Sequence, residues 1–423
     1  MRNKILIILP CLPYPLKSGG HQAMFNGISA IKDEYDISIA YEALDDESYR
    51  VAVRDFAKEI PSVKLFPLLR VLPPKCSRLR LFLGKIKVII KKVLNFNDIT
   101  PTDTKDDDEL MSTRWKNSVF PLGKNWIDHI SSLCSAYHFD IIQVEMPGLI
   151  SQVLSLPHGS KKLFVHHEIG FVRRKLEMSM KEHDEYMKAC CSFADFNEVF
   201  MLNMYDMVVT LSPIDAKKLK DHGVHTPICS SFAIVDSEVD SVNEPSDGRR
   251  LVFIGPDSHA PNLIGITWFL ENCWEKLKCI DSKFRLDIIG QWEEKRICEF
   301  KSKYEDVEFM GFVEDLKAAL KGSVIIVPIT IGSGIRMKIL EACSNGIPFV
   351  STTVGAEGIP VENGKHCFIA NTPSEFIDDI VKLQDKEIQK KFVDNSHRLI
   401  NEFYSLEALR KNRLTIYDQL LEK

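Results

Sequence analysis

The feature that most constrains the fold of this chain is the segment 324–357, where an apolar strand, a glycine loop, a helix start and a second strand follow in succession. The run Val324 to Val327 is apolar and β-branched, and Pro328 closes it. Gly332-Ser333-Gly334 then exposes backbone N–H groups where a helix begins. A strand that leads through a glycine turn into a helix is typical of α/β proteins, and its N–H donors suit a diphosphate.

Three charged residues follow the glycine loop. Arg336 and Lys338 fall in the first turns of the predicted helix, where positive charge opposes the helix dipole unless an anion lies nearby. Glu341 follows Lys338 by three residues, so both side chains project from one helical face. The carboxylate there can accept two hydroxyl hydrogen bonds, as from a ribose. The structural alternative is a solvated surface pair.

Strand and helix signals alternate through both halves of the chain, which predicts parallel sheets with helical crossovers. The pattern pauses in the polar stretch DSVNEPSDGRR, which ends at residue 250. The fold class is therefore predicted as α/β, with two doubly wound Rossmann-like domains facing a cleft. The predicted divisions are an N-terminal domain of residues 1–240, a linker of 241–250, a C-terminal domain of 251–405 and a final amphipathic helix within 406–423.

The residues after Glu341 occur in a recognisable order: Ala342, Gly346, Ile347, Pro348, Phe349, Val350, Ser351, Gly355, Glu357, Gly358 and Ile359. This order resembles the donor-site segment of family 4 glycosyltransferases (glycosyl transferases group 1), the retaining enzymes with the GT-B fold. The resemblance implies a nucleotide diphosphate sugar as donor, with no other cofactor and no metal, and a glycan or lipid-linked acceptor. It also implies that the N-terminal domain takes the acceptor, and that the last helix packs back onto that domain.

The chain departs from the family pattern at one position. The usual motif has a first glutamate where this chain has Ser333, and a sub-group of the family carries G-S-G followed by a basic residue instead. The resemblance then assigns the role of the missing glutamate to backbone amides or to Ser333 itself.

Glycosyl transfer requires positive charge to stabilise the departing nucleotide diphosphate. Arg336 and Lys338 are the predicted cations, aided by the amides of Gly332 to Gly334. The family's more usual basic pair would lie between Gly255 and Asn262, and this stretch contains no Lys or Arg. Asn262 is predicted to cap the next helix, and the resemblance adds a phosphate contact. The resemblance also adds Gly358 and Ile359 to the donor-binding residues.

Two features of the first half are predicted to reach the same cleft. Gly19-Gly20 follows the first strand and resembles the family's N-terminal glycine loop, although such a pair is usually a tight backbone turn. His166-His167-Glu168 ends another strand, where polar residues face the cleft of α/β folds. The family commonly has a His there, which binds the 6-hydroxyl of the sugar or assists departure of the leaving group. We favour His167, then His166 and Glu168, against a purely structural histidine.

Composition excludes several other classes of protein. The 423 residues carry a net charge of −5, which argues against nucleic acid as a partner. Eleven cysteines without a C-x-x-C pair indicate reduced thiols in the cytoplasm. The apolar start at residues 5–9 is too short for a signal peptide and predicts a buried strand instead. No zinc spacing, Ser-His-Asp signature or P-loop occurs.

Residues 61–97 are strongly basic and contain no Asp or Glu. Within them, 79–94 shows one apolar helical face opposite a basic one, which predicts contact with an anionic membrane surface or a helix packed on its own domain. The acidic run at 106–109 matches the metal-binding D-x-D pattern formally, but a solvated loop is the preferred interpretation.

The sequence therefore predicts a cytoplasmic, membrane-peripheral retaining glycosyltransferase that acts in cell-surface polysaccharide synthesis. Two alternatives stay open. One is a nucleotide-sugar epimerase of the same fold. The other is a non-catalytic nucleotide-sugar-binding partner subunit, which Ser333 favours.

Overall fold

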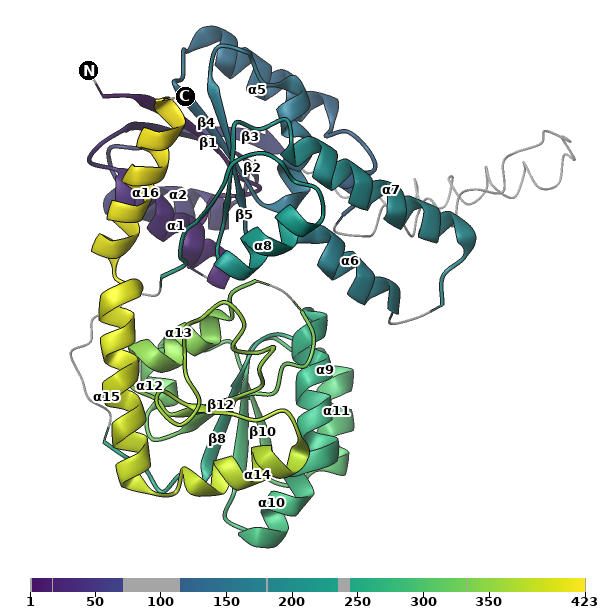
Figure 1. Cartoon of the computed structure of the whole chain (residues 1–423), viewed down its shortest axis with the longest axis vertical. Coiled ribbons are helices and arrows are strands. Elements are labelled where there is room, and N and C mark those ends of the chain that lie inside the picture. The colour runs from purple at the N-terminus through teal and green to yellow at the C-terminus, as the bar shows by residue number, and fades with distance from the viewer. Residues whose placement is uncertain are drawn as a thin grey trace, which may run out of the picture.

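The computed structural model describes residues 2–16, 18–70, 115–179, 182–234, 244–332 and 334–422, and these form two parallel sheets with helices around each (Figure 1). The first sheet has the strand order β3-β2-β1-β4-β5-β6-β7. Its strands are β1 (Lys4–Ile8), β2 (Asp36–Leu44), β3 (Lys64–Arg70), β4 (Ile141–Glu145), β5 (Lys161–His166), β6 (Met207–Thr210) and β7 (Ile228–Ser230). The helices between them are α1 (Gly19–Ile31), α2 (Glu47–Glu59), η1 (Lys116–Ser118), α5 (Lys124–Ala136), η2 (Pro147–Ser155), α6 (Gly170–Ser179), α7 (Glu185–Leu202) and α8 (Pro213–Asp221).

The central strand β1 shows why this sheet is covered on both faces. Its residues are apolar without alternation, as expected for a strand buried on two sides. Ile5 and Ile7 pack in one cluster with residues of α1 and α2, whereas Leu6 and Ile8 pack in a second cluster with α5 and η2. The segment at 5–9, which resembles the start of a signal peptide, is thus the middle of a folded sheet.

The second sheet has the order β10-β9-β8-β11-β12-β13. Its strands are β8 (Arg250–Ile254), β9 (Arg285–Ile289), β10 (Val307–Gly311), β11 (Val324–Val327), β12 (Phe349–Ser351) and β13 (Phe368–Ile369). The helices are α9 (Ala260–Phe269), η3 (Leu270–Trp274), α10 (Glu275–Ile280), α11 (Glu294–Lys303), α12 (Leu316–Leu320), α13 (Met337–Ser344), α14 (Pro373–Lys382) and α15 (Lys386–Phe403).

The helix that Asn262 is predicted to cap begins before this residue and contains a π-helical turn. α9 starts at Ala260 because Pro261 occupies its first turn, where a missing N–H costs nothing. A π-helical turn, η3, then separates α9 from α10.

The final helix, α16 (Leu406–Leu421), lies against α1 of the first sheet's domain (Figure 1). The ring of Tyr417 packs edge-on against Tyr35 at 5.3 Å between centroids, and Arg410 forms an ion pair with Glu34. The chain thus crosses from the second domain back to the first.

Three sequence predictions concern residues outside the described ranges. The basic segment 61–97 is described only as far as residue 70, within β3. The described ranges exclude its remainder, 71–97, and also the acidic run 106–109 and Ser333. No helix among the described residues is long and apolar enough to cross a membrane.

Candidate functional site

The loop between β11 and α13 meets the first domain at two glycines. A Cβ added to Gly19 would lie 2.4 Å from Cγ of Met337, and one added to Gly334 would lie 3.0 Å from the carbonyl oxygen of His167. The first turn of α1 and the carboxyl end of β5 therefore lie directly against the loop and start of α13. This contact brings the predicted residues of both domains to one place.

Arg336 is the N-cap of α13 and is buried, with 7% of its surface exposed. Its Nη1 donates to the carbonyl of Gly334 at 2.6 Å. Gly332 has a φ of +129°, and a Cβ there would lie 2.9 Å from Nη2 of Arg336, so glycine makes room for the guanidinium. Burial lowers the pKa of Arg336, and the carboxylates of Glu168 and Glu357 oppose that shift.

Lys338 is the second residue of the same helix, and its side chain points towards the second sheet. Its Nζ donates to Oδ1 of Asn262 at 2.8 Å and lies 4.3 Å from the ring centre of Phe253 in β8. Burial lowers its pKa from 10.5 to about 7, and the neighbouring charge of Arg336 adds to that shift. The half-buried ammonium of Lys338 beside the buried guanidinium of Arg336 concentrates positive charge, which suits an anionic ligand.

Glu341 lies one further turn along α13, where burial raises the pKa of its carboxyl from 4.5 to about 7. Gln22 of α1 donates to its Oε1 at 3.5 Å across the domain boundary. Glu341 is therefore not a solvated partner of Lys338 but part of the buried contact between domains. A carboxylate in this position can accept hydroxyl hydrogen bonds from a ligand.

Asn262 differs from its predicted role as a helix cap. The N-cap of α9 is His259, and Asn262 lies within the first turn with its side chain folded back. Its Nδ2 donates to the carbonyl of Pro256 at 3.0 Å, while its Oδ1 accepts from Lys338. A Cβ at Gly255 would lie 2.4 Å from Nδ2 of Asn262, so this glycine admits the amide. Asn262 thus orients Lys338.

The first-domain glycines form the first turn of α1 rather than a free loop. Ser18 caps this helix by accepting from the backbone N–H of His21 at 3.2 Å. Gly19 faces Met337, and a Cβ at Gly20 would lie 3.1 Å from Cε of Met146. These glycines allow α1 to approach both α13 and the end of β4.

The region after β12 also reaches the first domain. Gly358 has a φ of +84°, and a Cβ there would lie 2.8 Å from Cβ of Ser212. Its neighbour Glu357 forms an ion pair with Lys218 of α8. Ile359 is buried, with 6% exposure, so its side chain contributes to the core.

The three candidates at the end of β5 occupy different environments. His166 is buried, and its Nε2 lies 3.0 Å from Oε1 of Glu198 in α7. Glu168 forms an ion pair with Arg173 at 2.6 Å. His167 contacts the loop through its carbonyl, and its Nε2 lies 2.7 Å from Oε2 of Glu145.

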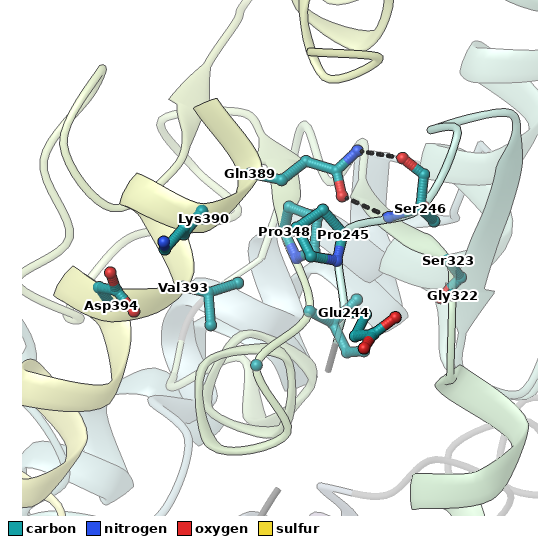
Figure 2. A pocket seen from close by; sticks show the side chains of 12 residues that line it. Glu244, Pro245, Ser246, Gly322, Ser323, Pro348, Gln389, Lys390, Val393 and Asp394 are labelled. Carbon is teal, nitrogen blue, oxygen red and sulfur yellow. Dashed lines mark hydrogen bonds between the residues drawn. The ribbon is translucent and has the colours of Figure 1, made fainter. Parts of the chain in front are cut away.

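No group of three or more His, Cys, Asp or Glu side chains is arranged to hold a metal ion in the part of the chain that the structure describes. A separate cavity of about 190 Å³ opens at the amino ends of β11 and β12, beside α15 (Figure 2). Pro245, Pro348 and Val393 line it, and Gln389 exchanges hydrogen bonds with the backbone of Ser246 at 3.0 Å. It lies at the opposite end of the second sheet from Arg336 and Lys338.

Residues 248–386 match a family model described as Glycosyl transferases group 1. The chain is also 22% identical over 422 residues to an uncharacterized 44.6 kDa protein in the cps region of Klebsiella pneumoniae, covering 95% of this chain and 96% of that protein.

Three solved structures share the overall fold. TarM of S. aureus, in complex with UDP among other ligands, has a TM-score of 0.67 at 12% identity, covering 100% of both chains. Anabaena HepE in complex with UDP-glucose has a TM-score of 0.63 at 13% identity, covering 98% of this chain and 99% of that one. Sucrose-phosphate synthase of Thermosynechococcus elongatus has a TM-score of 0.68 at 13% identity, covering 100% of both chains. The predicted fold class, two Rossmann-like domains in the GT-B arrangement, is confirmed.

Proposed function

We propose that this protein is a retaining glycosyltransferase that moves a sugar from a nucleotide diphosphate sugar to a glycan or lipid-linked acceptor in cell-surface polysaccharide synthesis. One observation carries the proposal. Arg336, which is buried, and Lys338, which is half-buried, lie together beside the glycine loop of α13, at the carboxyl end of the second sheet, where ligands bind in open α/β folds.

The chemistry of the site suits a diphosphate leaving group. As the bond from sugar to phosphate breaks, negative charge grows on the phosphate oxygens, and Arg336 and Lys338 supply positive charge without a metal. The backbone N–H groups of the glycine loop and of the first turn of α13 add donors. Glu341 then lies where it accepts hydroxyl hydrogen bonds from the ribose.

The relatives support the same assignment at a coarser level. The matched family is one of glycosyl transferases, and two proteins of the same fold are described with UDP. The Klebsiella relative is encoded in a cps region, which supports a polysaccharide product. Retention of configuration rests on the sequence resemblance alone. The described cysteines form no disulfide, which supports a reducing cytoplasm.

The proposal is tested with a panel of nucleotide sugars. Because a ligand at one hundred times its dissociation constant adds about 2.7 kcal/mol of stability, the correct donor is expected to raise the melting temperature by several degrees. The variant R336A should lose this shift, and R50A should keep it, because Arg50 is exposed and pairs only with Asp45. If no nucleotide sugar stabilises the wild-type protein, the proposed function is wrong.

The products distinguish the remaining alternatives. A transferase yields a glycosylated acceptor and free nucleotide diphosphate, whereas an epimerase converts the donor sugar without an acceptor. A non-catalytic partner subunit binds the donor and yields neither product.

A further inference from the structure

A continuous chain of four buried side chains joins the last helix to the cleft. Oη of Tyr417 in α16 lies 2.6 Å from Oε1 of Gln143 in β4. Nε2 of Gln143 lies 2.6 Å from Oε1 of Glu145, and Oε2 of Glu145 lies 2.7 Å from Nε2 of His167. Tyr417, Gln143 and Glu145 are 1–3% exposed, and 9% of the His167 side chain is accessible.

The carboxylate determines the direction of every hydrogen bond in this chain. An ionised carboxylate only accepts, so Gln143 must present its amide NH₂ to Glu145 and its carbonyl oxygen to Tyr417. Tyr417 must then donate its hydroxyl hydrogen. For the same reason, His167 must carry a hydrogen on Nε2. Its other ring nitrogen, Nδ1, has no hydrogen-bond partner among the described residues and bears the lone pair when the ring is neutral.

We propose that Glu145 is a positioning residue of the transfer site, which fixes His167 as the Nε2–H tautomer so that Nδ1 accepts a hydrogen bond from a substrate hydroxyl. The inference rests on the proposed function, because the substrate hydroxyl belongs to the sugar or its acceptor. Gln143 and Tyr417 fix the position of Glu145 through their hydrogen bonds, so the packing of α16 against the first domain contributes to the orientation of His167.

The backbone beside Glu145 supports a role beyond packing. Met146 has a φ of 77°, a left-handed value that is uncommon for a residue with a side chain and is concentrated at functional sites. The strained residue lies at the end of β4, and its side chain reaches Gly20 of α1. The chain therefore turns sharply where the carboxylate must face the end of β5.

The neighbouring pair of His166 and Glu198 differs from the pair of His167 and Glu145, because it serves only the packing of the first domain. Glu198 also accepts from the backbone of Gly170 at 2.8 Å and pairs with Arg174. His166 has a fully buried Nδ1, whereas Nδ1 of His167 is not among the fully buried polar atoms. Of these two histidines, His167 alone has a carbonyl against the glycine loop of α13.

The variant E145Q tests the tautomer directly. When Gln143 and Tyr417 keep their wild-type orientation, a glutamine at 145 offers its oxygen to Gln143, so its NH₂ faces Nε2 of His167 and moves the ring hydrogen to Nδ1. Transfer kcat is expected to fall by about tenfold to 100-fold, as when a residue that orients a histidine is changed. The dissociation constant for the nucleoside diphosphate of the stabilising donor should stay within about twofold of wild type, because this ligand lacks the transferred sugar and its phosphates face the other domain.

A double-mutant cycle separates positioning from a general structural effect. If Glu145 acts through His167, the double variant E145Q/H167A should transfer no more slowly than H167A. Multiplied losses in the double variant would overturn the inference. The conservative variant Y417F should retain the Nε2–H tautomer and lose less activity than E145Q.

Nitrogen NMR of labelled histidine gives a readout that needs no substrate. In the wild-type protein at neutral ring charge, the signal of the protonated nitrogen should correlate with Nε2 of His167, and in E145Q with Nδ1. An Nδ1–H tautomer in the wild-type protein would refute the positioning role. This result is independent of whether any transfer activity is found, so failure of the proposed function is recognised separately.

Discussion

The affinity for the donor is expected to fall steeply with rising pH, because Lys338 must be charged to hold a diphosphate. Burial lowers its pKa from 10.5 to about 7 in the empty site. A bound diphosphate favours the ammonium form and raises the pKa again. The complex therefore holds more protons than the free protein above pH 7, and by linkage the affinity is greatest below pH 7 and falls above it.

The size of the effect follows from the fraction of Lys338 that is protonated. Each pH unit above about 7 reduces that fraction about tenfold, and each factor of ten costs about 1.4 kcal/mol of binding free energy. At pH 9 the dissociation constant is thus expected to be about 100-fold larger than at pH 6, if binding restores an ordinary lysine pKa.

The assay is isothermal titration at pH 6, 7, 8 and 9 with whichever nucleotide sugar stabilises the protein most. A nucleotide sugar is preferred to the free diphosphate, because its phosphates are esterified at both ends and do not titrate in this range. Proton uptake measured in buffers of different ionisation enthalpy should approach one per ligand at pH 8.

Two variants serve as controls for the assignment to Lys338. K338R keeps its charge throughout the range, so its affinity should vary little between pH 7 and 9. K338M carries no charge and should bind weakly at every pH. A wild-type affinity that stays constant from pH 6 to 9, or a slope that persists in K338M, would refute the reasoning.

Three further outcomes are expected. Burial raises the pKa of Glu341 to about 7, so the free energy of unfolding falls as the pH rises from 4.5 to 7. E341Q should therefore add on the order of 2 kcal/mol to the unfolding free energy at pH 8 and nothing at pH 4. In the thermal assay the same variant should bind donor more weakly. The substitution G19V should push Met337 away and weaken donor binding by calorimetry, whereas G27A, at a helical glycine with nothing within 4 Å, should keep donor affinity and add about 0.5–1 kcal/mol to the unfolding free energy in urea. Transfer rates should be unchanged by EDTA, because Arg336 and Lys338 take the place of a metal ion; a rate that falls with EDTA and returns with a divalent cation would contradict this assignment.

The fold class could be predicted from the sequence because the residue patterns that mark strands and turns are local. The run Val324 to Val327 is uniformly apolar, and Pro328 and the glycine loop end it within a few residues. Such signals mark strand ends, and in a parallel sheet the strand ends meet on one edge. His167 follows β5 of the first sheet and the loop before α13 follows β11 of the second, so their contact also requires that the carboxyl ends of the two sheets face each other.

Side-chain contacts between segments that are distant in the sequence could not be predicted. Gln22 meets Glu341 across 319 positions of sequence, and Lys338 meets Asn262 across 76. The role of Asn262 as a cap was predicted from its neighbours alone, and the packing of Gly255 against its amide decides otherwise. A Gln or Glu inside a strand, such as Glu145, gives no sign of its partner until the neighbouring strand is known.

The sequence by itself determined the alternation of strands and helices, the glycine loop before α13 and the presence of Arg336, Lys338 and Glu341 on one helix, since each depends on spacing along the chain. Only the tertiary structure decided that Arg336 is buried and that desolvation brings the pKa values of Lys338 and Glu341 to about 7. It also decided that Glu145 faces His167. The physical reason is that burial and desolvation depend on which surfaces meet, and the two domains bring together surfaces that are hundreds of residues apart.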